Sequence, residues 1–175
     1  MDILNLKKKS AHKFIQNQLK KAGKTKKVVP ENLFTIGIIA DLRLWEAFDF
    51  IKDLENHLKI SSDKFKVLLI TSGEEEKKDQ TYLSFSEEDL GMFAKIKDEE
   101  VRSFIGQEFD LLIDYSGLDN YLTQILLLQS KAKLKAGFFK EDLNIFDISI
   151  KTPDNKIVVF NEELARYLKI MGFLE

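Results

Sequence analysis

The residues best suited to chemistry lie where predicted strands give way to turns. Three aspartates could supply oxygen ligands to a divalent cation, and two serines, each followed by glycine, could present a hydroxyl nucleophile. In a parallel α/β sheet the carboxyl ends of the strands meet at one edge, and such folds bind their ligands there. The candidate ligand-binding residues at this edge are Asp41, Arg43, Ser72, Gly73, Asp114, Ser116, Gly117 and Asp119.

The same turns lack what several familiar chemistries require. No GxGxxG, GxxxxGK[ST] or GxSxG pattern occurs in the sequence, which disfavours dinucleotide binding, triphosphate binding and serine hydrolysis in their usual forms. His12 and His57 fall on predicted helices, so neither is well placed as a base for Ser72 or Ser116. The chain has no cysteine, which removes thiolate chemistry. We therefore assign no catalytic residue, no metal ligand and no cofactor.

The amino-terminal segment offers a second kind of site. Residues 1–27 hold nine lysines against Asp2, a balance of +8, and because the whole chain carries −2 the remaining 148 residues carry −10. A basic arm on an acidic body is typical of binding to nucleic acid or an anionic surface, although the lysines could instead be solvated surface without a partner. The candidate partner-binding residues are Lys7, Lys8, Lys9, Lys13, Lys20, Lys21, Lys24, Lys26 and Lys27.

The strands that must position these residues are predicted from apolar runs. Runs without polar interruption indicate strands buried on both faces, and the alternating pattern near residue 148 indicates an edge strand with one wet face. The predicted strands cover 33–40, 65–71, 81–85, 109–114, 134–139 and 145–151.

Helices are predicted from apolar residues at helical spacing. In the first of them, Phe14, Ile15 and Leu19 form a narrow stripe that should lie against the body. The last should begin at Asn161 as its N-cap, and the segment before it could form a further short strand or lead into that helix. The predicted helices cover 3–22, 44–58, 98–106, 119–131 and 161–174.

This alternation of strands and helices predicts an α/β fold. We expect a three-layer sandwich, Rossmann-like or flavodoxin-like, around a mostly parallel sheet of five or six strands. Residues 1–27 should form a basic amphipathic helical arm and linker, and residues 33–175 a single α/β domain. No apolar run approaches the roughly 20 residues that span a bilayer, and no secretory signal is visible, so we expect a cytoplasmic protein.

The run FDLLIDYSGLDNYLTQILLLQSKAKLKAGF, residues 109–138, resembles a segment in the N-terminal half of the heptosyltransferase-like glycosyltransferases. Those enzymes have two Rossmann-like halves and bind the donor nucleotide largely through the second. Because this chain has the length of one half, the resemblance implies the fold rather than the activity.

Nearly the whole chain, from Leu6 to Ile170, also resembles a family of small uncharacterised bacterial proteins. The resemblance rests on the lysine-rich first helix and on TIGIIAD, FDLLIDY, SKAKLKAGF and ELARYLKI in that order. It implies one intact domain and brings no catalytic residues with it.

Three functional hypotheses follow. The leading one is a non-enzymatic α/β domain that binds RNA, a ribosome or an anionic membrane surface through its lysine-rich arm. The alternative is a small-molecule binding protein or enzyme that holds a nucleotide or sugar-nucleotide in the strand-end crevice. In the third, the lysine-rich helix packs on its own domain or on a second copy, which leaves a monomer and a homodimer both open.

Overall fold

A six-stranded sheet forms the centre of the protein, and all of its neighbouring strands are parallel. The structure, a computed structural model, describes residues 3–21, 29–73, 82–117, 119–141 and 143–174. The strands are β1 (Ile36–Asp41), β2 (Phe65–Ile70), β3 (Leu83–Phe85), β4 (Leu111–Asp114), β5 (Leu134–Phe138) and β6 (Ile148–Ile150). Their order, β3-β2-β1-β4-β5-β6, is that of the Rossmann fold rather than the flavodoxin-like alternative.

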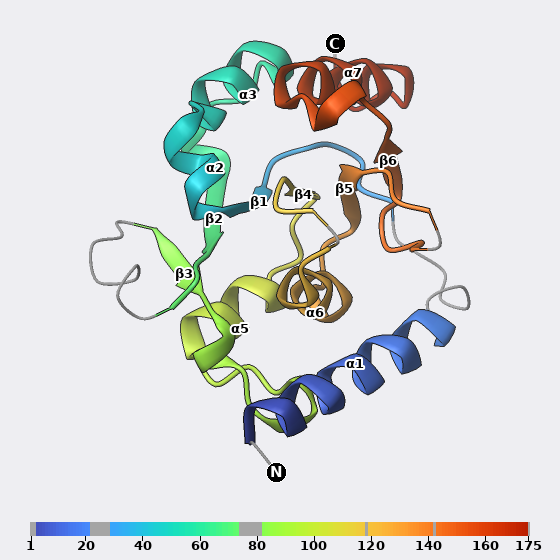
Figure 1. The fold of residues 1–175 in the computed structure, drawn as a ribbon. Coiled ribbons are helices and arrows are strands. Elements are labelled where there is room, and N and C mark those ends of the chain that lie inside the picture. Colours follow the sequence, from blue (N-terminus) through green and yellow to red (C-terminus); the bar gives the residue numbers. More distant parts are fainter. Residues whose placement is uncertain (1–2, 22–28, 74–81, 118, 142, 175) are drawn as a thin grey trace.

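Helices cover both faces of the sheet, as Figure 1 shows, so the predicted three-layer α/β sandwich is confirmed. One face carries α1 (Ile3–Lys21), α5 (Glu99–Gly106) and α6 (Tyr121–Gln129). The other carries α2 (Leu42–Ala47), α3 (Phe50–Leu58) and α7 (Ile157–Ile170). Because side chains alternate along a strand, β1 sends Ile39 into the first layer and Ile38 into the second, and both are fully buried. Burial on both faces explains the unbroken apolar runs.

Helix α1 is packed on the body rather than standing free of it. Ala11 and Ile15 are buried in the core of the first layer, and Phe14 and Leu19 pack against that core, as the narrow apolar stripe predicted. The helix lies along α6 and along the short 3₁₀ turn η3 (Met92–Ala94). No helix among the described residues is long and apolar enough to cross a membrane.

Two predicted elements differ from the structure. The single helix predicted over 44–58 is two helices, because Phe48 is extended and Asp49 caps α3 by accepting a hydrogen bond from the backbone N–H of Lys52. The predicted cap Asn161 lies instead inside α7, which begins at Ile157 and so also absorbs the segment that could have been a strand. Asn161 is fully buried, with its amide bound to two other buried or half-buried polar side chains.

Candidate functional site

The first strand ends at Asp41, and its side chain caps the following helix. Its Oδ1 accepts hydrogen bonds from the backbone N–H of Arg43 at 3.0 Å and from Nε of the same residue at 3.3 Å. The Arg43 side chain is otherwise largely exposed. Capping of a helix by an aspartate satisfies backbone donors that the helix itself leaves open. Asp41 and Arg43 therefore have a structural partner in each other.

At the end of β4, a compact polar turn forms around Asp114, which is fully buried. Its carboxylate accepts hydrogen bonds from the backbone N–H of Ser116 at 3.0 Å, from the Ser116 hydroxyl at 2.5 Å and from the backbone N–H of Gly117 at 3.2 Å. The Ser116 hydroxyl also lies 2.8 Å from that of Thr123 in α6. Gly117 has a φ of +82°, which favours glycine. The polar groups of this turn are thus bonded to one another.

Burial is the main electrostatic feature of this turn. Removal from water raises the pKa of Asp114 to about 6, and the hydrogen bonds from Ser116 and Gly117 act in the opposite sense. A carboxylate placed here also repels an incoming phosphate. The turn is therefore suited to holding β4 against α6 and poorly suited to cradling an anion.

The remaining residues of the predicted strand-end site are Ser72, Gly73 and Asp119. Ser72 and Gly73 follow β2, where a Cβ on Gly73 would lie 3.9 Å from the carboxylate of Glu88. Asp119 forms an ion pair with Lys140. Within the described ranges, no group of three or more histidine, aspartate or glutamate side chains could hold a metal ion. The structure thus gathers Asp114, Ser116 and Gly117 into one turn, and ligand binding by the predicted set stays a prediction.

The lysines of the basic arm fall into three groups. Lys9, Lys13, Lys20 and Lys21 are exposed on α1. Lys7 and Lys8 are half-buried, and Lys8 pairs with Glu87 at 3.2 Å. Lys24, Lys26 and Lys27 lie outside the described residues. Because Ala11 and Ile15 face the body, the exposed lysines of α1 are presented outward.

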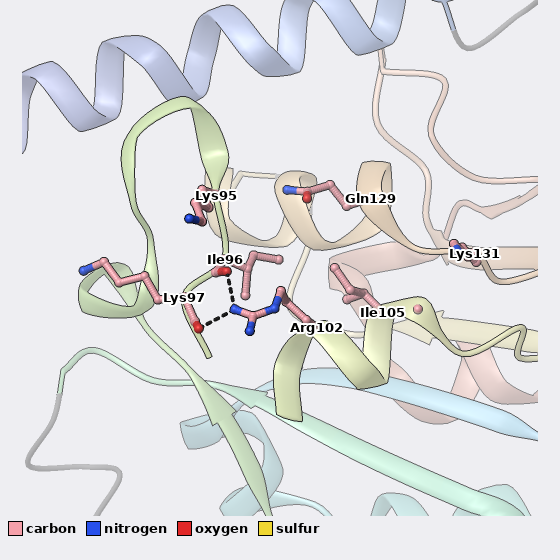
Figure 2. Close-up of a pocket in the computed structure, with 8 residues that line it drawn as sticks. Lys95, Ile96, Lys97, Arg102, Ile105, Gln129 and Lys131 are labelled. Atoms are coloured by element: carbon pink, nitrogen blue, oxygen red, sulfur yellow. Dashed lines mark hydrogen bonds between the residues drawn. The ribbon is translucent and has the colours of Figure 1, made fainter. Parts of the chain in front are cut away.

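Next to α1 the surface is hollowed, and basic residues line the hollow. The cavity has a volume of about 680 Å³ and lies between α5, α6 and residues 95–97, and α1 runs past the tip of the loop that precedes these residues (Figure 2). Its walls carry four cations and no carboxylate. We call it the basic hollow; it is lined by Lys95, Ile96, Lys97, Arg102, Ile105, Gly106, Gln129 and Lys131.

The four cations of the basic hollow differ in how they are held. Arg102 donates from Nη1 to the backbone oxygens of Ile96 and Lys97 (Figure 2), and its Nη2 lies 3.3 Å from Glu99. Lys97 donates to the backbone oxygen of Glu88 at 2.8 Å. Lys95 and Lys131 are exposed, and no carboxylate of the described residues forms an ion pair with either. The hollow therefore has a fixed guanidinium in its wall and two lysines available to an anion.

The sequence did not point to this hollow. Its cations come from the 95–102 region and from Lys131 after α6, and the acids Asp98, Glu99 and Glu100 interrupt them along the chain. The net charge of residues 28–175 is −10, so the net charge of this segment gives no sign of a local group of basic residues. The one local signal is the alternation Lys95, Ile96, Lys97, which places both lysines outward around a buried isoleucine.

The fold and the hollow together define an all-parallel α/β protein with a basic surface beside its amino-terminal helix. The chain belongs to DUF6913, a family of unknown function, whose sequence model matches residues 7–171. No curated protein and no solved structure matches the chain. This match confirms the predicted membership of a family of unknown function. It does not support a bacterial origin or the resemblance to the heptosyltransferase-like glycosyltransferases.

Proposed function

We propose that this protein is a non-enzymatic RNA-binding domain whose contact surface combines the exposed lysines of α1 with the basic hollow. The observation that carries the proposal is the hollow itself, a concave surface with four cations and no carboxylate on a chain of net charge −2. A local positive field on an acidic molecule attracts phosphates selectively to that surface.

The packing of α1 favours RNA over an anionic membrane. A helix that binds a bilayer surface buries its apolar face among the acyl chains. In α1 the apolar residues Ala11 and Ile15 are already buried in the protein core. The apolar stripe of the helix is therefore occupied by the protein core while its lysines face outward, which suits a phosphate backbone.

The strand-end crevice supports the alternative less well. Asp114, Ser116 and Gly117 are bonded to one another, and Asp119 pairs with Lys140. A nucleotide or sugar-nucleotide bound there would raise the unfolding temperature, since a ligand at about 100 times its dissociation constant adds about 2.7 kcal/mol of stability. A shift with such a ligand, together with no RNA binding, would favour that alternative.

The test is fluorescence anisotropy with a labelled RNA of about 12 nucleotides, titrated with the full chain between about 50 and about 200 mM salt. Replacing Lys95 and Lys131 with glutamine removes two phosphate contacts, so the slope of log affinity against log salt should fall by about 1.4 for a single strand. Lys52→Gln with Lys156→Gln is the matched control, because these exposed lysines accompany α3 and α7 on the opposite face of the sheet.

Three outcomes would overturn the proposal. One is the absence of RNA binding at the lowest salt. The second is an equal loss of affinity in the Lys52 and Lys156 control, which would indicate an unspecific charge effect. The third is binding to anionic lipid vesicles in preference to RNA, which would assign the lysines to a membrane surface.

A further inference from the structure

The 90–96 loop beside the basic hollow holds its backbone in an unusual conformation. Phe93 has a φ of +57° and Ala94 a φ of +59°, so two consecutive residues that are not glycine lie in the left-handed region. Such residues are uncommon, and each stores backbone strain that persists only where the surroundings enforce it.

Several contacts enforce this conformation. Within the loop, the N–H of Gly91 donates to the oxygen of Lys95 at 2.7 Å. Leu90 and Ile96 form an antiparallel bridge at its base. From outside, the N–H of Phe93 donates to the Ser10 hydroxyl of α1 at 3.1 Å. The side chain of Gln129 in α6 donates to the oxygen of Ala94 at 2.9 Å. The loop is thus fixed by two helices that are distant in sequence.

The result of this fixation is that an aromatic ring is presented to solvent. Ala94 is buried at 1% exposure, whereas Phe93 is 74% exposed. A single exposed apolar side chain is common on protein surfaces and needs no explanation by itself. Here it is accompanied by backbone strain and by tethers from two helices, so the ring is held outward on a rigid support.

The backbone of Phe93 also lies close to a cation of the hollow. Phe93 is two residues from Lys95, so their Cα atoms are at most about 7 Å apart. An aromatic face beside a basic groove is the combination by which proteins hold single-stranded nucleic acid, since the phosphates meet the cations and a base stacks on the ring. In an A-form duplex the base faces are stacked on one another and are not accessible to the ring.

We propose that Phe93 stacks on an unpaired base of single-stranded RNA whose neighbouring phosphates enter the basic hollow. This inference rests on the proposed function and adds the substrate class to it, single strands with accessible bases. Because every base has a π face, the contact selects for single strands and not for a particular sequence.

The test compares three labelled ligands of equal length on the full chain, of which the two single chains also carry equal charge. They are a single-stranded RNA, the corresponding duplex, and a ribose-phosphate chain without bases. The protein should prefer the single-stranded RNA to the chain without bases by about 5- to 150-fold, the range expected of one stacked base. Phe93→Leu should abolish that preference without changing the salt slope, and Phe93→Trp should retain it. Phe139→Leu is the matched control, since Phe139 is also exposed, at 46%, and follows β5.

Phe93→Asn separates binding from folding. Asparagine tolerates a positive φ better than phenylalanine, so this variant should unfold at the same denaturant concentration as the natural protein or a higher one. It should nevertheless lose the preference for bases. A loss of affinity in a variant with an unchanged unfolding midpoint cannot come from loss of the fold.

The outcomes distinguish the two proposals. If all three ligands bind with the same affinity and Phe93→Leu changes nothing, the stacking inference is wrong while the RNA-binding function stands. The inference is also overturned if Phe139→Leu abolishes the preference as fully as Phe93→Leu. If none of the ligands binds at about 50 mM salt, both proposals fail together.

Discussion

The backbone N–H of Phe93 donates a hydrogen bond to the side-chain hydroxyl of Ser10, 83 residues earlier in the chain. The same hydroxyl donates to the backbone oxygen of Lys7 at 2.8 Å, so Ser10 joins a turn of α1 to the strained loop. Helix α1 is therefore tied to the 90–96 loop by a polar contact as well as by the burial of Ala11 and Ile15.

Ser10→Ala should loosen the loop and leave the fold intact. The N–H of Phe93 loses its acceptor, and since it lies at the surface, water replaces part of the bond, so the free energy of unfolding should fall by about 0.5–1.5 kcal/mol. Hydrogen exchange should quicken at the Phe93 amide more than at the amides of β1. Ser103→Ala on the exposed side of α5 is the control. Unchanged exchange at Phe93 would show that Ser10 does not hold the loop.

Most of the fold could be predicted from the sequence because burial on both faces of a parallel sheet leaves continuous apolar runs. The break between α2 and α3 at Phe48 could not be predicted, because Phe48 and Ile51 keep the apolar spacing of one continuous helix. Only the cap formed by Asp49 in the structure shows where the second helix begins. Asn161 was wrongly placed for a related reason. An asparagine before a helical run is typical of an N-cap. The residues around Asn161 in the sequence do not indicate that its side chain binds Tyr115, which follows β4.

The candidate sites were also predicted only in part from the sequence. The turn around Asp114 and Ser116 was found in sequence, because a strand followed by small polar residues indicates a strand end. The contact of the Ser116 hydroxyl with Thr123 was not found, because Thr123 belongs to the first turn of the following helix α6. The basic hollow was missed altogether. It forms only when Lys95 and Lys131, 36 residues apart, are brought together by the fold.

Gly137→Ala should destabilise the protein strongly. A Cβ at this position in β5 would lie 2.2 Å from the ring of Phe146, far inside van der Waals contact. Overpacking of this kind costs about 1–3 kcal/mol, measured as a fall in the free energy of unfolding by urea. Gly106→Ala is the control, since its Cβ would meet nothing within 4 Å, and the helix should gain slightly.

A double variant tests the cause of that loss. If the Phe146 ring is responsible, Phe146→Val should harm the Gly137→Ala protein less than it harms the natural one, because the smaller side chain relieves the clash. Equal harm in both backgrounds would place the cause of the destabilisation elsewhere in β5.

Tyr115→Phe should lower stability by breaking a buried polar chain. The Tyr115 hydroxyl donates to Oδ1 of Asn161 at 2.5 Å, and the Asn161 amide donates to Asp53 at 2.6 Å. Tyr115 is 2% exposed and Asn161 is fully buried, so the oxygen left without its donor cannot recruit bulk water. The free energy of unfolding should fall by about 1–3 kcal/mol.

Tyr167→Phe is the control for that measurement. Tyr167 lies on α7, as Asn161 does, but is 43% exposed, so loss of its hydroxyl should change stability by less than about 0.5 kcal/mol. Equal effects of the two substitutions would mean that the buried chain contributes nothing of its own.

Asp114→Asn should flatten the dependence of stability on pH. Burial raises the pKa of Asp114 in the folded protein to about 6, against 3.8 for the exposed side chain. Between those values the folded protein holds a proton that the unfolded chain has lost. The contribution of Asp114 to stability is therefore fully present below about pH 4 and falls as the pH rises through about 6. The loss amounts to about 3 kcal/mol, at 1.36 kcal/mol for each pH unit.

Urea unfolding at several pH values between about 4 and about 7 measures this effect. Asparagine has no proton to lose but keeps an oxygen for the N–H groups of Ser116 and Gly117, so the variant should lack the part of the slope that Asp114 supplies. Asp119→Asn is the matched control, because Asp119 is exposed and its ion pair with Lys140 lies at the surface, where such pairs contribute little. The natural protein and the Asp119 variant should then show parallel profiles, with the Asp114 variant alone departing from them. A profile for Asp114→Asn that runs parallel to the other two would mean that the buried carboxylate titrates near its ordinary pKa, and that water or movement of the β4–α6 turn reaches it.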